Sequence, residues 1–70
     1  MSNRKVELVA ARRNLGLSRK QAAKKLKMAE ETLKRAEEGE FIYDSNKKLI
    51  VDFYKLGQVT DVWPVEELLQ

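Results

Sequence analysis

Residues 17–39, LSRKQAAKKLKMAEETLKRAEEG, decide the fold of this 70-residue chain. Apolar residues recur in this stretch at the three- and four-residue spacing of amphipathic helices, which predicts two helices over residues 19–26 and 30–38. Residues 27–30 form the turn and the entry to the second helix. Helices this short are not stable alone in water. We therefore expect them to pack at an angle against each other and against the rest of the chain.

The apolar spacing fits a close helix–turn–helix unit over residues 18–39. Ala23 is small enough to let the two helices cross. Apolar residues are then needed one position before it and three, five, ten and thirteen positions after it, and those positions hold Ala22, Leu26, Met28, Leu33 and Ala36. Ser18 is the expected N-cap of the first helix, with Gln21 completing a capping box. Gly39 is expected to end the second helix.

A further helix is expected before this unit, over residues 3–14. Ser2 or Asn3 can cap its N-terminus, and Gly16 is the expected residue beyond its C-terminus. Its expected inward stripe consists of Val6, Leu8, Ala11 and Leu15.

After the unit, residues 41–44 predict a loop and residues 46–56 a fourth helix. Asp44 or Ser45 can cap this helix, and Gly57 is expected to end it. The loop residues are apolar and aromatic, and we expect Ile42 and one of the aromatics to enter the core.

A short fifth element is expected around residues 59–63, with Thr60 as its N-cap and Pro64 breaking it. No segment alternates with the two-residue period of a strand, so the fold class is all-α, with five short helices in one domain, residues 1–70. Residues 57–70 are a possible dimerisation segment. Trp63 can instead be a core residue. The candidate interface residues are Val59, Val62, Trp63, Leu68 and Leu69.

The composition excludes several classes of site. The chain has no cysteine and no histidine, which excludes disulfides, a Cys/His zinc site and histidine acid–base catalysis. No apolar run approaches the roughly 18 residues of a membrane span, and residues 1–9 are too charged for a signal peptide. No glycine-rich phosphate loop and no spaced carboxylate pair is present. We expect a cytoplasmic protein that is not an enzyme and has no cofactor, metal, membrane or small-molecule ligand.

The charge is unevenly distributed. Residues 1–40 hold 11 Lys/Arg and 6 Asp/Glu, a balance of +5, and residues 41–70 hold 3 Lys and 5 Asp/Glu, a balance of −2, which sum to the net +3. A basic part suggests a polyanionic partner. A lysine-rich surface that serves only solubility explains the same charge equally well.

The chain resembles the lambda-repressor-like helix–turn–helix family of small phage and bacterial transcriptional regulators. The resemblance covers almost the whole chain. It rests on an Arg four residues before Gly16, the Leu17-Ser18 step, Ala23 at the crossing, the Thr32-Leu33 pair, the Glu37-x-Gly39 ending and the stretch VDFYKLGQVTDVWP over residues 51–64. Two positions depart from the family pattern. Lys27 stands where the turn usually has Gly, so it must take the left-handed region or change the turn. Ala29 stands where a Ser or Thr usually caps the second helix.

The resemblance implies binding of double-stranded DNA by a homodimer on an inverted repeat. The implied base-contacting residues are Glu30, Glu31, Thr32, Lys34 and Arg35. The implied phosphate-contacting residues are Arg13, Arg19, Lys20, Lys24, Tyr43, Ser45, Asn46 and Lys47. Arg12 is expected to pair with Glu37 and tie the first helix to the third.

Two alternatives stay open for these residues. Glu30 and Glu31 can simply favour the positive N-terminal end of their helix, and each lysine can simply be solvated. An acidic entry to the recognition helix also fits a protein-interaction module, such as an anti-repressor or adaptor, with little DNA binding.

Overall fold

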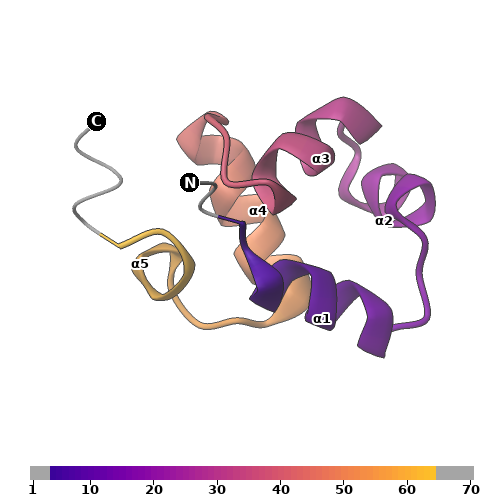
Figure 1. Ribbon diagram of the computed structural model, residues 1–70, viewed down its shortest axis with the longest axis horizontal. Helices are drawn as coiled ribbons and strands as arrows, with labels where there is room; N and C mark the ends of the chain where they lie inside the picture. The colour runs from indigo at the N-terminus through magenta and orange to yellow at the C-terminus, as the bar shows by residue number, and fades with distance from the viewer. Residues whose placement is uncertain (1–3, 65–70) are drawn as a thin grey trace.

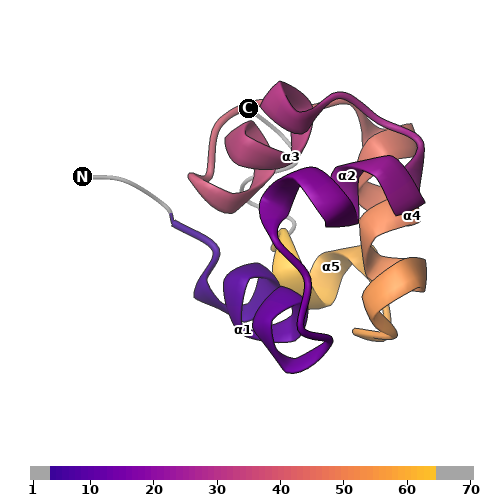
Figure 2. The same cartoon turned by 90° about the vertical axis from the view of Figure 1, so that its right-hand side faces the viewer.

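The computed structural model describes residues 4–64, and all regular structure in that range is helical. This confirms the predicted all-α class. The helices are α1 Val6–Asn14, α2 Arg19–Leu26, α3 Glu30–Glu37, α4 Asp44–Tyr54 and α5 Val59–Val62 (Figure 1). α2 packs against α3 and α4, α1 packs against α3 and α4, and α5 packs against α4. Figure 2 shows α2 in the foreground, with α1 below it, α3 above it and α4 beside it.

The inward faces predicted for α2 and α3 are buried in the structure, and Met28 packs against them from the turn. They join residues from every other helix in one core: Leu8, Ala22, Ala23, Leu26, Leu33, Ala36, Ile42, Ile50, Val51, Tyr54, Val62 and Trp63. Burial of this shared core supplies the stability that the short helices lack alone.

The start of α2 is fixed by the predicted capping box. The Gln21 amide donates to Ser18 Oγ at 3.1 Å, and the Ser18 amide donates to Gln21 Oε1 at 2.9 Å. The end of α2 keeps the geometry of a glycine turn without the glycine. Lys27 takes the left-handed region with φ 59°, and the Met28 amide closes the turn by donating to the Ala23 carbonyl at 3.0 Å. α3 then begins after Ala29, which makes no side-chain capping bond.

α1 begins later than predicted, at Val6, and the predicted caps Ser2 and Asn3 lie outside the described residues. The Lys5 amide donates to the Glu37 carbonyl at 2.8 Å. This bond ties the chain to the end of α3 just before the helix starts. The predicted inward stripe is partly wrong, because Val6 and Leu15 are exposed, and Val9 is buried in addition to Leu8.

α4 differs from the prediction at both ends. It begins two residues earlier, so Tyr43 is the N-cap residue, and the predicted caps Asp44 and Ser45 lie in the first turn. It ends at Tyr54 rather than before Gly57, because Lys55 takes the left-handed region with φ 56°.

α5 was predicted with the wrong cap. Gln58 is the N-cap residue, and Thr60 lies inside the helix. The Asp61 carboxylate accepts a hydrogen bond from the Gln58 amide at 2.7 Å. An acid three residues after the cap satisfies the cap amide, and that contact places the cap two residues before Thr60.

Candidate nucleic-acid interface

α3 divides into a buried side and an outward side. Leu33, Ala36 and Glu37 are buried. The side chains that were expected to meet base edges lie on the remaining surface: Glu30, Glu31, Lys34 and Arg35 are exposed, and Thr32 is half-buried. The structure therefore brings the five candidate residues together on the free surface of one helix.

The charged residues on the outward side of α3 form one weak ion pair with each other. Arg35 Nε lies 3.9 Å from Glu31 Oε1, one helical turn away, and both side chains are at least half exposed. Exposed pairs of this kind contribute little to stability. The Arg35 guanidinium is thus free to exchange this partner for another acceptor.

α2 adds a basic surface beside α3. Lys20 and Lys24 are exposed, as predicted for residues that would meet phosphates. Lys25 and Lys27, which were not predicted to contact phosphates, are exposed as well. Both belong to the basic run KKLK over residues 24–27, in which Lys27 was predicted only as a turn residue. Arg13 is also exposed, near the end of α1.

The predicted pair of Arg12 and Glu37 is present, and it is part of a larger cluster. Arg12 Nε donates to Glu37 Oε2 at 2.8 Å, and Arg12 Nη2 donates to Oε1 at 3.4 Å. Arg19 joins the same carboxylate, because its Nε and Nη2 both lie 3.2 Å from Oε1. We call Arg12, Arg19 and Glu37 the Glu37 junction. It links α1, α2 and α3 through a carboxylate that is 1% exposed.

Arg19 therefore does more than the sequence predicted. The resemblance assigned it to a phosphate, and in the structure it also contacts Glu37, with 32% of its side chain still exposed. Sequence spacing gives no signal for this contact, because the two residues belong to helices whose crossing angle is set by the core.

A buried hydroxyl lies in the electrostatic field of the Glu37 junction. The Tyr54 side chain on α4 is buried, and its oxygen has no hydrogen-bond partner among the described residues. Burial, and next the negative charge of Glu37, raises the pKa of the Tyr54 hydroxyl to about 12, with Arg12 opposing the shift. A neutral Tyr54 is thus favoured in the folded protein.

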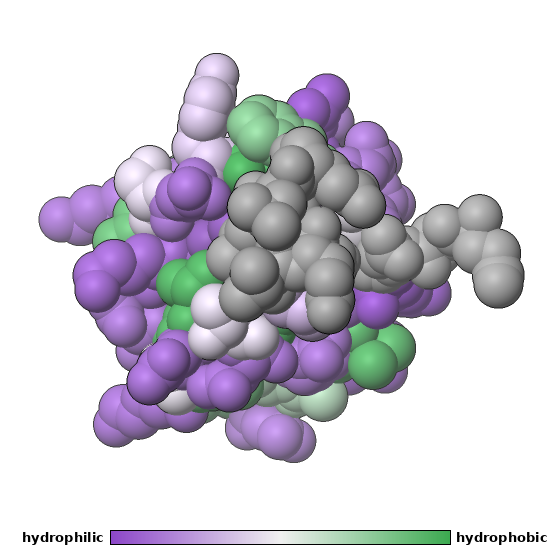
Figure 3. Space-filling view, turned by 90° about the vertical axis from the view of Figure 1, so that its left-hand side faces the viewer, coloured by the Kyte–Doolittle hydropathy of each residue, from purple (hydrophilic) through white to green (hydrophobic). Residues whose placement is uncertain are grey.

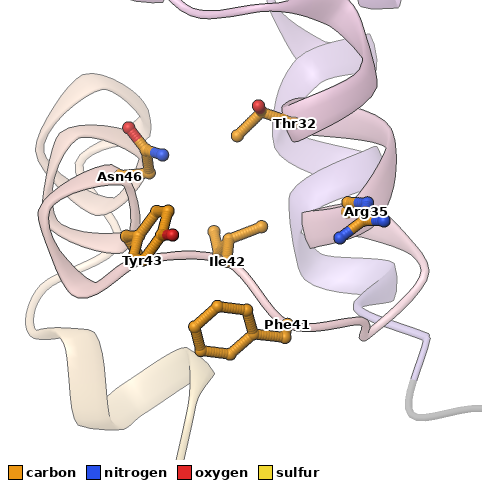
Figure 4. A pocket seen from close by; sticks show the side chains of 6 residues that line it. All are labelled: Thr32, Arg35, Phe41, Ile42, Tyr43 and Asn46. Carbon is orange, nitrogen blue, oxygen red and sulfur yellow. The ribbon is translucent and has the colours of Figure 1, made fainter.

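A shallow groove runs along the flank of α3 that faces α4. Thr32 and Arg35 form one side, Asn46 and Tyr43 form the other, and Phe41 and Ile42 lie between them (Figure 4). Its volume is about 250 Å³. The polar groups that were expected to meet bases and phosphates on Thr32, Arg35, Tyr43 and Asn46 thus border one hollow. Ser45 is exposed next to it.

The loop that lines this groove was only partly predicted. Ile42 is in the core, as expected, but neither aromatic is. Phe41 is 66% exposed and Tyr43 is 70% exposed. Their rings meet edge to face, with centroids 5.4 Å apart. Of the three loop residues, only Ile42 is buried in the core.

Lys47 was predicted to contact a phosphate, and in the structure it lies against Trp63. Its side chain is buried, with Nζ 5.7 Å from the centroid of the Trp63 ring and 3.5 Å from Asp44 Oδ1. Lys47 lies on the buried face of α4 together with Ile50, Val51 and Tyr54. The phosphate contact predicted for Lys47 stays a prediction, and it would require the ammonium to leave Asp44 and Trp63.

Three of the five possible dimer-interface residues pack within one protomer, and core packing is the alternative that the sequence left open for Trp63. Trp63 is 3% exposed and Val62 is 4% exposed, both within the core of one protomer, and Val59 is half-buried against that core. α5 folds back on α4, and this packing covers them. Leu68 and Leu69 lie outside the described residues.

Other kinds of site receive no support within residues 4–64. No cluster of three or more acidic groups that could hold a metal ion occurs there, and no helix in that range has the length and apolar content needed to cross a bilayer. On the face shown in Figure 3, hydrophilic residues predominate outside the grey atoms, and hydrophobic residues form small separate patches.

No family model matches the chain, and no curated protein or solved structure matches it significantly.

Proposed function

We propose that this protein is a sequence-specific DNA-binding transcriptional regulator of the lambda-repressor-like helix–turn–helix type. The observation that carries the proposal is the α2–α3 pair. α2 is capped at Ser18, packs against α3 with Ala23 buried, and turns through a left-handed residue into a helix whose outward side is polar and charged. Such a pair presents its second helix to the major groove.

The charges of the two helices support this use. α2 contributes three exposed lysines, the turn after it adds Lys27, and α3 contributes Lys34 and Arg35. In the proposed complex Arg35 reads a guanine through its N7 and O6 atoms, and Lys34 assists it. Glu30 or Glu31 accepts a hydrogen bond from a cytosine amino group. The exposed lysines of α2 contact phosphates, which fix the position of the helix without reading sequence.

The proposed complex is a homodimer on an inverted repeat, as for small phage or prophage regulators. A two-fold dimer would place two copies of α3 one DNA turn, roughly 34 Å, apart. The buried Trp63 is not available for this interface without local opening, so exposed residues elsewhere on the protomer would form it.

Titration of purified protein against short duplex DNA at several salt concentrations tests the proposal. If about five phosphates are contacted, log K should fall against log[salt] with a slope of about −4 to −5. Arg35→Ala should relax the preference at one base position and cost roughly 1–3 kcal/mol. Glu40→Gln is a matched control, since Glu40 is exposed and lies outside α3. Absence of any salt-dependent binding would reject the proposal.

One observation favours a second candidate, a protein-interaction module. The acidic entry of α3, at Glu30 and Glu31, repels phosphates, and the exposed rings of Phe41 and Tyr43 lie near the same helix. Capture of a stoichiometric protein partner that is lost with Phe41→Ala, together with no binding to duplex DNA, would select this candidate.

A further inference from the structure

The Glu37 junction holds two guanidinium groups on one carboxylate. Its formal charges sum to one surplus positive charge, and the two arginines are not equivalent. Arg12 is 13% exposed at its side chain and Arg19 is 32% exposed. The contacts of Arg12 and Arg19 therefore show which of the two carries the surplus positive charge.

Arg12 alone satisfies the buried carboxylate. Its Nε and Nη2 donate to the two different oxygens of Glu37, and its Nη1 donates to the Leu17 carbonyl at 3.2 Å. Two parallel bonds to both oxygens form the strong fork geometry of arginine and carboxylate. Removal of any other partner would leave Glu37 neutralised and hydrogen-bonded on both oxygens.

Arg19 is the second and weaker partner. Both of its contacts are 3.2 Å long and go to Oε1, which also accepts from Arg12. Arg19 is the first residue of α2, whose first turn contains no acidic residue. Its side chain reaches the solvent beside the exposed lysines of α2, so it can move outward without unburying the core.

We propose that Glu37 is an internal competitor for DNA: in the free protein Arg19 rests on Glu37, and on binding it transfers to a phosphate while Arg12 stays. This inference rests on the proposed function. The transfer is possible only because Arg12 keeps the buried carboxylate paired, since a buried charge without a partner is strongly destabilising. Arg12 is thus a positioning residue that determines whether Arg19 contributes to binding, although Arg12 itself contacts no DNA.

A double-mutant cycle on binding to a short mixed-sequence duplex at low salt tests this coupling. Arg19→Gln in the native background should weaken binding roughly tenfold and make the salt slope shallower by about 0.9. In an Arg12→Gln background, Glu37 depends on Arg19, so Arg19→Gln should change affinity less than about twofold. Circular dichroism establishes that each variant is folded at the temperature used. Equal losses in the two backgrounds would overturn the inference.

A second measurement uses the native protein and does not depend on any variant folding. The Nε–H resonances of Arg12 and Arg19 are followed by NMR as the same duplex is added. The inference expects the Arg19 resonance to shift while the Arg12 resonance stays. A stationary Arg19 resonance, with DNA bound, would overturn the inference and leave the proposed function intact. Failure of the native protein to bind any duplex would reject the proposed function itself.

Discussion

Glu37 and Lys47, two of the buried charged side chains of this protein, are held in different ways. Glu37 is a short, acceptor-only group enclosed among three helices, and two arginines donate to it. Lys47 has its stem packed beside Trp63 and its ammonium 3.5 Å from Asp44, an exposed residue at the edge of the fold. A long cationic side chain can bury its methylene groups and still reach the surface, whereas a buried carboxylate depends on its partners. The first site should therefore be sensitive to loss of charge and the second to loss of packing.

The largest expected effect is at Glu37. Glu37→Ala leaves Arg12 largely buried and without its partner, and should lower the free energy of unfolding by about 3–5 kcal/mol. Urea unfolding followed by circular dichroism measures this, with the exposed Glu40→Ala as control. A loss as small as that of the control would show that the junction does not tie the helices together.

Removal of the ring at the other site should come next. Trp63→Ala opens a cavity at the contact of α4 and α5 and should cost about 3 kcal/mol. The same unfolding measurement applies. If the monomer kept its stability and only self-association changed, Trp63 would belong to an intermolecular interface and the core assignment would be wrong.

The free energy of unfolding should fall at alkaline pH because of Tyr54, which lies near Glu37. Its pKa rises from 10.0 in the unfolded chain to about 12 in the folded protein. The folded state thus holds this proton more tightly, and the resulting stability is present below pH 10 and lost as the pH rises toward 12. The loss should be roughly 2–3 kcal/mol.

Tyr54→Phe provides the control for that window. It should remove the loss of stability between pH 10 and about 12 that Tyr54 causes. Stability at neutral pH should be unchanged or slightly higher, since the buried hydroxyl has no partner among the described residues. Unfolding curves at pH 7, 10 and about 11.5 compare the two proteins. Identical alkaline losses in both would contradict the role assigned to Tyr54.

The smallest effect is expected for the charge of Lys47. Lys47→Met keeps an unbranched stem against Trp63 and removes only the ammonium, so stability should change by less than about 1.5 kcal/mol. Lys47→Ala removes the stem as well and should cost more. If Met and Ala were equally harmful, the ammonium rather than the packing would dominate, and the contrast with Glu37 would disappear.

The sequence predicted the elements whose signals are local. The capping box at Ser18, the small residue at Ala23 and the apolar spacing from Ala22 to Ala36 depend on neighbours within one or two turns, and all are present. The left-handed turn at Lys27 was one of two options that the sequence left open. The pair of Arg12 and Glu37 came from resemblance, because no local spacing relates residues 25 positions apart.

The errors, and the contacts that were not predicted, occur where the tertiary structure outweighs local preference. Glycine rules placed the end of α4 at Gly57, but Lys55 takes the left-handed conformation first. The choice of Ser and Thr as caps failed where Tyr43 and Gln58 occupy the cap positions. The role of Lys47 and the burial of Trp63 depend on α5 folding back onto α4, and the contact of Arg19 with Glu37 depends on the crossing of α2 and α3. Neither arrangement has a signature within a single helix.

The central claim is that the outward side of α3 reads DNA. Selection of bound sequences from randomised duplex DNA, at two salt concentrations, tests it most directly. We predict an enriched inverted repeat. Its half-sites should keep their base preferences at the higher salt while the overall affinity falls, and Arg35→Ala should lose one guanine preference. Recovery of unselected sequence at both salt concentrations would contradict it.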